Sequence, residues 1–323
     1  MAFPRVIGAG STWRWAALTI CVVIAAAVFI APGPDNNVRS AIAIHDFGHV
    51  VAFGLVTALL AITLSVQSRP TFQGRARATC LAAMAALAVG ATVELAQAAS
   101  GLHGDPWDVV RDGGGVLSVS LTLVALDSRT SGRLRAVLAG LAVLVLAAFA
   151  HPVYAALDDE ARARAQFPVL ASFETPSELS RFHFGDGMSP RIVVTTDDQG
   201  RAISAAQLHL PPGRYPGFEL RYFPGDWRGL RTLQLLINNP ENTSIELTVR
   251  IDDNEYRVRM DDRYNRSFLL SSGVNRIEIP LSEVAASPRD RRFDLGRVHS
   301  LLVFAVDLES PRTIVLGPIT LLH

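Results

Sequence analysis

The residues best suited to chemistry lie in the stretch HDFGHVVAFG, residues 45–54. His45 and His49 are four residues apart with Asp46 after the first, which is close to the His-Glu-x-x-His pattern of zinc proteases. This spacing places both imidazoles on one face of a helix, where zinc would need a third ligand such as Glu94. Two hypotheses follow: a catalytic metal centre, or a polar site without metal.

Two further stretches carry polar pairs at helical spacing. VELAQ contains Glu94 and Gln97, and DPWDVVRD contains Asp108 and Asp112. Spacings of three and four residues put each pair on one helix face. Asp105, which a proline follows, is predicted to cap the start of the helix that carries Asp108.

These motifs lie in an apolar half of the chain that predicts about five transmembrane helices. Each apolar stretch has roughly the 20 residues that span the hydrocarbon core of a bilayer. The stretches lie near residues 13–31, 45–66, 78–98, 107–126 and 134–152. Gly90 and the glycines at 113–115 are predicted to let neighbouring helices approach closely.

Arginines in the short loops predict the orientation of these spans. They gather before the first span, at 69–77 and at 129–135, whereas the loops at 32–44 and 99–106 contain only Arg39. Basic loops stay in the cytoplasm, so everything after Tyr154 is expected outside. The three polar motifs then share one depth near the outer surface. The candidate site residues are Asp46, His49, Glu94, Gln97, Asp108 and Asp112.

The order of the motifs Asp46-x-x-His49, Glu94-x-x-Gln97 and Asp108-x-x-x-Asp112, before a glycine-rich segment, resembles the VanZ-like family of small bacterial membrane proteins. The resemblance covers roughly residues 15–126. It implies a place in the cell envelope and a link to teicoplanin-type glycopeptide resistance, without an agreed reaction. The chain departs from the family at two positions: Leu102 or His103 replaces an arginine before the last motif, and Asp112 replaces an asparagine. The family pattern does not include His45, so neither zinc nor another metal is expected.

Composition separates this half from the rest of the chain. The chain has thirty basic and thirty acidic side chains, so it lacks the excess of positive charge that is typical of nucleic-acid-binding proteins. Both cysteines, Cys21 and Cys80, lie in the apolar half, so no disulfide is expected in the polar half. The predicted domains are a VanZ-like membrane domain at 1–154, a linker with a short helix at 155–169 and a β-domain at 170–323.

The polar half has the period-two pattern of an all-β jelly-roll sandwich. Short alternating segments recur with turn residues between them. The predicted strands are 202–210, 217–223, 230–239, 244–252, 255–260, 266–272, 275–281, 300–306 and 312–322.

Alternation within 244–260 predicts which side chains face the core. The inward set is Ile245, Leu247, Val249 and Ile251, and the outward set is Glu246, Thr248 and Arg250. If the strand 255–260 pairs with 244–252, it adds Arg257 and Arg259 to the outward face. That face is either a solvated lattice of salt bridges or a polar groove for a polyhydroxylated ligand.

The segments 216–230, 250–268 and 273–284 resemble the galactose-binding-like jelly rolls of carbohydrate-binding modules. The resemblance implies sugars stacked on Trp227 and Tyr264. The residues implied to hydrogen-bond the sugar are Asp226, Arg250, Asp252, Arg257, Asp262 and Asn265. Phe173-Glu174 matches the start of the family's calcium site, but Gly317 stands where the aspartate is expected, so no calcium is predicted.

The sequence therefore favours a multi-pass protein of the bacterial inner membrane with an extracytoplasmic sandwich that binds or senses envelope glycan. The expected partners are membrane lipids and a glycan or glycopeptide, with no nucleic acid and no cofactor. An alternative is a membrane-embedded enzyme, either a metal-dependent hydrolase or an enzyme of lipid-linked head groups, that uses Asp46, His49, Glu94 and Asp108. A structural scaffold is the third hypothesis. The motifs leave an enzyme open but favour a binding protein.

Overall fold

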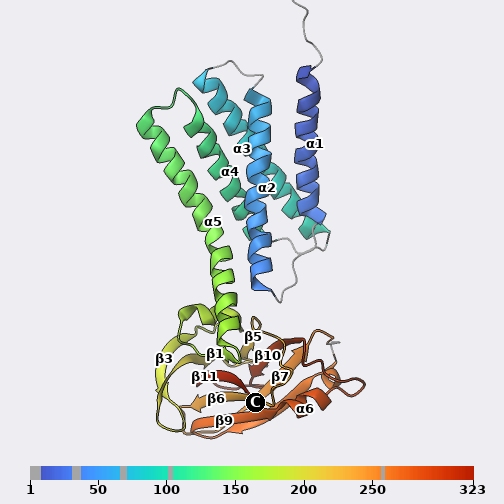
Figure 1. The fold of residues 1–323 in the computed structure, drawn as a ribbon, viewed down its shortest axis with the longest axis vertical. Helices are drawn as coiled ribbons and strands as arrows, with labels where there is room; N and C mark the ends of the chain where they lie inside the picture. The colour runs from blue at the N-terminus through green and yellow to red at the C-terminus, as the bar shows by residue number, and fades with distance from the viewer. Residues whose placement is uncertain (1–8, 31–37, 66–70, 101–104, 256–258) are drawn as a thin grey trace, which may run out of the picture. The chain divides into compact units, whose positions relative to one another are not determined.

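The computed structural model describes residues 9–30, 38–65, 71–100, 105–255 and 259–323. The chain divides into two compact units, Met1–Ala156 and Leu157–His323. Figure 1 shows long helices in the first unit and mainly strands in the second.

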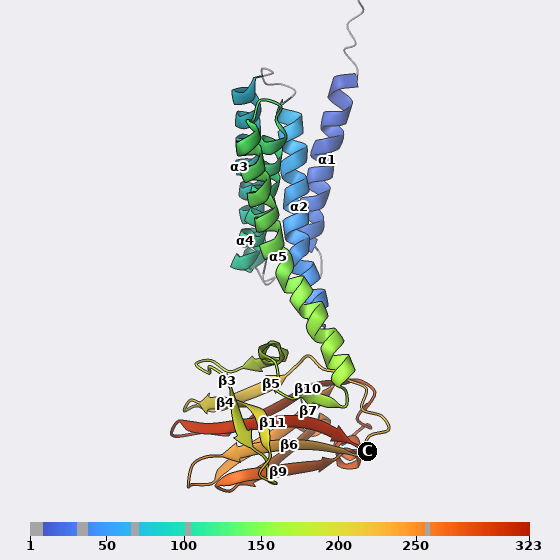
Figure 2. The same ribbon diagram turned by 60° about the vertical axis from the view of Figure 1, so that its left-hand side comes forward.

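The N-terminal unit consists of apolar helices. They are α1 Ala9–Ile30, α2 Arg39–Ser65, α3 Phe72–Ala99, α4 Pro106–Leu126 and α5 Gly132–Gln166. Helices α2 to α5 are each long and apolar enough to cross a membrane, which confirms four of the predicted spans as helices of that length. Helices α2, α3 and α4 pack against one another and α1 packs on α2, as Figure 2 shows. Membrane insertion of α1 stays a prediction.

The ends of two helices follow their local sequence. Asp105 caps α4 and accepts a hydrogen bond from the Trp107 N–H at 3.0 Å, with Pro106 as the first helical residue, as predicted. Helix α5 continues through residues 155–166, so the residues predicted to form a linker helix are the last turns of α5.

Glycines allow α2, α3 and α4 to approach closely. A Cβ on Gly115 would meet the carbonyl oxygen of Val50 and lie 2.9 Å from the Gly54 nitrogen. A Cβ on Gly90 would lie 2.5 Å from the Asp112 carboxylate. The predicted close approach is therefore confirmed at these glycines: a methyl group at Gly115 would collide with the backbone of α2, and one at Gly90 would displace the Asp112 side chain.

The C-terminal unit is an antiparallel β-sandwich, which confirms the predicted fold class. One sheet has the order β3-β4-β11-β6-β9, with β1 paired to β11, and the other has the order β2-β5-β10-β7-β8. The strands are β1 Val169–Ala171, β2 Phe182–Phe184, β3 Arg191–Thr196, β4 Ala202–Leu210, β5 Gly217–Leu220, β6 Thr232–Asn239, β7 Ile245–Asp253, β8 Tyr264–Leu270, β9 Gly273–Pro280, β10 Val298–Phe304 and β11 Arg312–Leu322. Short helical segments lie at Pro176–Arg181, Met260–Asp262 and Leu281–Ala286.

The core between the two sheets is formed by the inward residues of the alternating segments. Ile245, Leu247, Val249 and Ile251 of β7 all belong to it, as their alternation predicts. Complete burial of one such side chain stabilises a fold by about 1.5–3 kcal/mol, so this pattern determines the register of β7.

Residues 256–258 of the expected strand 255–260 lie outside the described residues, but both edges of β7 are taken by other strands, so the pairing considered for 244–252 is not formed. Strand β7 pairs with β8 on one side and β10 on the other, and Met260 begins a short 3₁₀ helix. Arg291 pairs with Asp253, the last residue of β7, and with Asp262, which lies just before β8, at 2.5 and 2.7 Å.

Candidate functional sites

The first candidate site is a polar cluster formed by α2, α3 and α4. We define the bundle cluster as Asp46, His49, Glu94, Asp105, Asp108, Arg111 and Asp112. Its centre is His49, whose Nδ1 lies 3.0 Å from the Asp112 carboxylate and whose Nε2 lies 3.6 Å from that of Asp108. His49 and Asp112 are buried, with 5% and 1% of their surfaces exposed. The imidazole therefore has a carboxylate on each nitrogen.

Arg111 holds the acidic side of the bundle cluster together. Its guanidinium donates to Asp46 of α2 at 2.8 Å and to Asp105 at 3.0 Å, and it also pairs with Asp108. Sequence reasoning missed this residue, although its spacing of three from Asp108 was a usable signal. One cation thus links α2 to the start of α4.

Glu94 brings the end of α3 into the same cluster. Its buried carboxylate accepts a hydrogen bond from the backbone N–H of Asp105 at 3.0 Å. Gln97 lies one turn further along α3, half-buried, and its Oε1 has no hydrogen-bond partner among the described residues. The structure therefore brings five of the six predicted polar residues together and leaves Gln97 beside them.

The bundle cluster suits proton transfer or hydrogen bonding to a polar group. The contact with Asp112 sets the orientation of the His49 ring through Nδ1, and Nε2 faces Asp108. A histidine held in this way can act as a general acid or base. The His45 ring lies 5.7 Å from the His49 ring, edge to face. In the described ranges, no group of three or more His, Cys, Asp or Glu residues could hold a metal ion.

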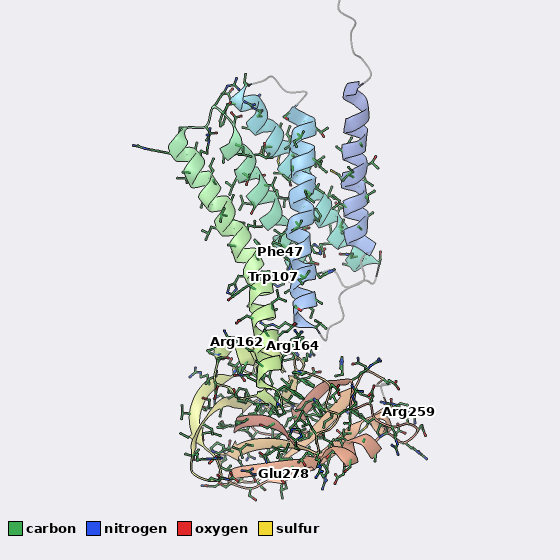
Figure 3. The ribbon with its side chains drawn as sticks, in the orientation of Figure 1. Phe47, Trp107, Arg162, Arg164, Arg259 and Glu278 are labelled. Atoms are coloured by element: carbon green, nitrogen blue, oxygen red, sulfur yellow. The ribbon has the colours of Figure 1, made fainter. Side chains whose placement is uncertain are left out.

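Aromatic side chains lie beside this cluster at the same end of the bundle. Figure 3 shows Phe47 of α2 and Trp107 of α4, which follow Asp46 and precede Asp108 in the sequence, at the same end of the bundle. Trp107 is largely exposed. Exposed tryptophan near the end of an apolar helix is typical of the interface between membrane and water.

The second candidate site is a groove on the outward face of the sheet β2-β5-β10-β7-β8. We call it the sandwich groove; its volume is about 600 Å³. It is lined by His183, Gly185, Tyr215, Gly217, Phe218, Glu219, Thr248, Arg250, Met260, Arg263, Asn265, Ser267, Leu302, Phe304 and Val306. The lining combines aromatic surface with hydroxyl, amide, carboxylate and guanidinium groups, which is the chemistry that recognises sugars.

Three of the predicted ligand-binding residues belong to this groove or support it. Arg250 and Asn265 line it. Asp252 is buried beneath, where it binds the Arg250 Nε at 2.8 Å and accepts from the Ser300 hydroxyl at 3.3 Å. Asp252 therefore orients Arg250 and has no access to a ligand of its own.

The predicted sugar-stacking roles of Trp227 and Tyr264 are wrong. Their exposed fractions are 0% and 4%, and both belong to the core between the sheets. The Trp227 indole N–H donates to the Pro224 carbonyl at 3.2 Å, and burial raises the pKa of the Tyr264 hydroxyl. Large aromatic rings stabilise a fold most when they are buried. The presence of an aromatic residue in a strand-rich segment therefore does not show that its ring is exposed for stacking on a sugar.

Two other predicted ligand residues, Asp226 and Asp262, do not line the sandwich groove. Asp226 forms an exposed ion pair with Arg228 at 2.6 Å, and the hydrogen bonds from Arg228 lower the pKa of Asp226 to about 2. Asp262 binds Arg291. Arg257 lies outside the described residues. Arg259, which was expected on the same face, pairs with Asp261 at the edge of the sandwich, where Figure 3 shows it.

Two aromatic residues of the groove were missed by sequence reasoning. The rings of Tyr215 and Phe304 lie 5.8 Å apart and perpendicular, and Tyr215 is more than half exposed. Phe304 could have been found, because it alternates with the buried Val303 along β10. Tyr215 lies between strands, where alternation carries no information.

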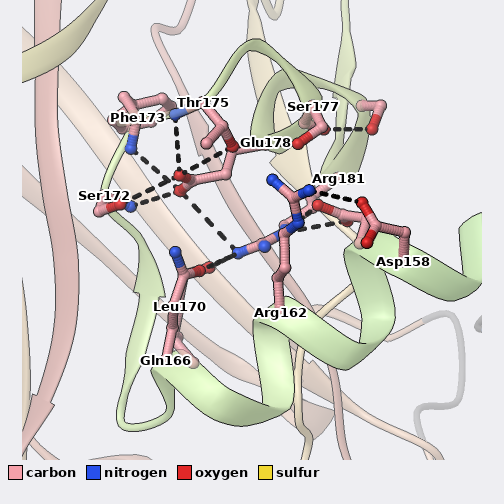
Figure 4. A network of polar contacts seen from close by, with 12 residues as sticks. Asp158, Arg162, Gln166, Leu170, Ser172, Phe173, Thr175, Ser177, Glu178 and Arg181 are labelled. Carbon is pink, nitrogen blue, oxygen red and sulfur yellow. Dashed lines mark hydrogen bonds and ion pairs between the residues drawn. The ribbon is translucent and has the colours of Figure 1, made fainter. Parts of the chain in front are cut away.

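A separate polar network in the sandwich unit has a structural role (Figure 4). Arg181 is fully buried and binds Asp159 at 3.0 Å, the Gln166 side chain at 3.2 Å and the Leu170 carbonyl at 3.1 Å. Glu178 lies 3.9 Å from Arg181. The network attaches the last turns of α5, which belong to this unit, to the first strand.

The residues considered for calcium do not form a ligand pair. Glu174 is exposed, and a Cβ on Gly317 would contact Leu236 and Ile203, at 3.2 and 3.3 Å. The Gly317 position is thus apolar, and a carboxylate there would be buried among aliphatic side chains.

Comparisons with known proteins find similarity only in solved structures; no family model and no curated protein matches the sequence. An exo-beta-agarase matches 47% of this chain and 24% of its own, with 17% identity and a TM-score of 0.40. A family 11 carbohydrate-binding module from Clostridium thermocellum, in complex with a beta-1,3-1,4-mixed-linked tetrasaccharide, matches 48% of this chain and 94% of its own, with 17% identity and a TM-score of 0.36. The chain thus covers about a quarter of the agarase.

Proposed function

We propose that the protein is a membrane-anchored glycan-binding protein whose sandwich groove takes an oligosaccharide of the cell envelope. The observation that carries the proposal is the groove itself, in which the perpendicular rings of Tyr215 and Phe304 lie with the polar side chains of Arg250 and Asn265. Sugar rings present an apolar face and a rim of hydroxyl groups, and this lining complements both. Asp252 supports the proposal because it holds Arg250 in one orientation.

Binding assays on the full-length protein in detergent test this proposal. The panel contains a β-1,3-1,4-linked tetrasaccharide, peptidoglycan fragments and lipopolysaccharide. Loss of an aromatic contact worth about 1 kcal/mol predicts roughly fivefold weaker binding for Tyr215→Ala. Asn265→Ala is expected to weaken binding similarly, because it removes hydrogen bonds to sugar hydroxyls.

The matched control is Val194→Ala, which changes an exposed residue of the other sheet. It should bind as the unchanged protein does. Absence of binding to every glycan tested, or equal affinity of Tyr215→Ala and the control, would contradict the proposal.

We further propose that the helical unit is VanZ-like and that the protein lies in the bacterial cytoplasmic membrane with the sandwich outside. The order of the three polar motifs and the arginine-rich loops support this. Deletion of the gene should then change susceptibility to glycopeptide antibiotics or to envelope stress. Equal susceptibility of the deletion strain and its parent would contradict the antibiotic role.

A second candidate function is a membrane-embedded enzyme acting on a lipid-linked head group. The observation that favours it is His49, buried between Asp108 and Asp112. His49→Ala, Asp46→Asn and Glu94→Gln should each reduce the envelope phenotype, whereas His45→Ala should leave it nearly unchanged. Elemental analysis should find no stoichiometric zinc; one zinc per chain, lost on mutating either histidine, would instead favour a metal-dependent hydrolase.

A further inference from the structure

A second groove, which we call the bundle groove, lies between α2, α4 and α5. Its volume is about 570 Å³, and small residues form much of its wall: Gly54, Ala58, Gly115, Ala139 and Ala142. Only 6% of the most apolar part of α5 is buried in the protein, against 44% for α2. Most of the surface of α5 is therefore not covered by other helices.

The hydroxyl groups in the wall do not require water. Thr122 donates to the Ser118 carbonyl at 2.8 Å, and Ser118 donates to the Ala142 carbonyl at 3.4 Å. The remaining lining is aliphatic or glycine, apart from Arg135. A groove whose polar groups are already satisfied suits a hydrocarbon chain.

The length of the bundle groove matches one leaflet of a bilayer. On α4 it runs from Gly115, near the middle of the helix, to Leu126 at its end. At about 1.5 Å per residue this distance is roughly 16 Å, and the wall from Arg135 to Leu146 on α5 has the same length. Half of a hydrocarbon core of about 30 Å is roughly 15 Å. One acyl chain of one leaflet therefore fits along the groove.

One end of the bundle groove is cationic. Arg135 lines that end, and its guanidinium is directed to the turn between α4 and α5 by hydrogen bonds to the carbonyls of Asp127 and Thr130, at 3.3 and 3.4 Å. The segment 127–135 contains three arginines and one aspartate. Basic residues at the end of a membrane helix attract anionic phospholipid.

We propose that the bundle groove binds an acyl chain of an anionic phospholipid, with the lipid phosphate at Arg135. The inference goes beyond glycan binding and does not depend on it. Its basis is the combination of an apolar wall, a length of one leaflet and a guanidinium at the end where a head group would lie.

Photo-crosslinking of the full chain in nanodiscs tests the proposal. The probe is phosphatidylglycerol with a diazirine in its acyl chain, and labelled peptides are expected from 115–126 and 135–146. Ala139→Phe places a ring in the groove and should lower this labelling about fivefold or more. Ala148→Phe is the matched control, because Ala148 is exposed and lies half a turn round α5 from the lining residues.

A second pair of variants tests the head group. One basic residue near the head group should make labelling by phosphatidylglycerol about fivefold stronger than labelling by phosphatidylcholine. Arg135→Gln should remove most of this preference. Arg133→Gln, a change at a residue that does not line the groove, should retain it. Labelling of exposed α3 as strong as that of the groove, or unchanged labelling in Ala139→Phe, would overturn the proposal.

Discussion

At the scale of single residues, Glu178 has a strong energetic role in the sandwich unit. It is fully buried, and its carboxylate accepts hydrogen bonds from the backbone N–H groups of Ser172 and Phe173, at 2.6 and 3.0 Å. Burial by itself raises the pKa of Glu178, but these hydrogen bonds, the Ser172 hydroxyl and Arg181 together hold it below its usual range. Glu178 therefore stabilises the fold as a carboxylate.

This predicts a pH dependence that can be measured on the fragment 157–323. A lowered pKa contributes stability that is fully present above the unfolded value of about 4.3 and is lost as pH falls through the folded value. Glu178→Gln should lower the free energy of unfolding at pH 7 by about 1–3 kcal/mol, because it replaces a charged acceptor of several hydrogen bonds. Urea unfolding should show this difference shrinking below about pH 4.

The neighbouring Glu174 provides the control for this prediction. It is exposed, so Glu174→Gln should change stability by no more than about 0.5 kcal/mol at any pH. A difference between the unchanged fragment and Glu178→Gln that stays constant from neutral pH down to pH 3 would contradict the role assigned to the Glu178 charge.

At the scale of elements, the packing of α2 on α4 depends on Gly115. A methyl group there would collide with the backbone of Val50 and Gly54. Gly115→Ala should therefore destabilise the helical unit by about 1–3 kcal/mol, the usual cost of overpacking. Gly140→Ala has open space around its Cβ, so it should be neutral or slightly stabilising, because alanine favours a helix by about 1 kcal/mol over glycine.

Thermal unfolding of the two variants in detergent, followed by loss of helical signal, measures this difference. Gly140→Ala controls for the general effect of alanine in an apolar helix. Equal midpoints for the two variants would mean that α2 and α4 can separate at Gly115 without loss of stability.

At the scale of the whole molecule, the distribution of arginines predicts the topology of the chain. Reporter fusions after residues 72 and 130 should report cytoplasm, because the arginines at 69–77 and 129–135 hold those loops on that side. A fusion after residue 160 should report the opposite side. Helix α5 is long and apolar enough to make the last crossing. A cytoplasmic signal after residue 160 would exclude an outward-facing sandwich.

The sequence by itself determined most of the secondary structure. Apolar stretches of membrane length correspond to α2, α3, α4 and α5, and most alternating segments correspond to strands of the sandwich. The cap at Asp105 and the inward face of β7 were also predictable. These features depend on periodicity and on neighbours along the chain, which are fully contained in the sequence.

The tertiary structure alone decided which residues meet. It buried Trp227 and Tyr264, opened a groove beside Tyr215, and placed Arg111 among the acids of the bundle cluster. It also paired β7 with β8 on one side and with β10 on the other. The physical reason is that burial, strand pairing and ion pairing depend on contacts between distant segments. A local pattern shows that a side chain faces one side of its strand, but only packing decides whether that side becomes core or a binding surface.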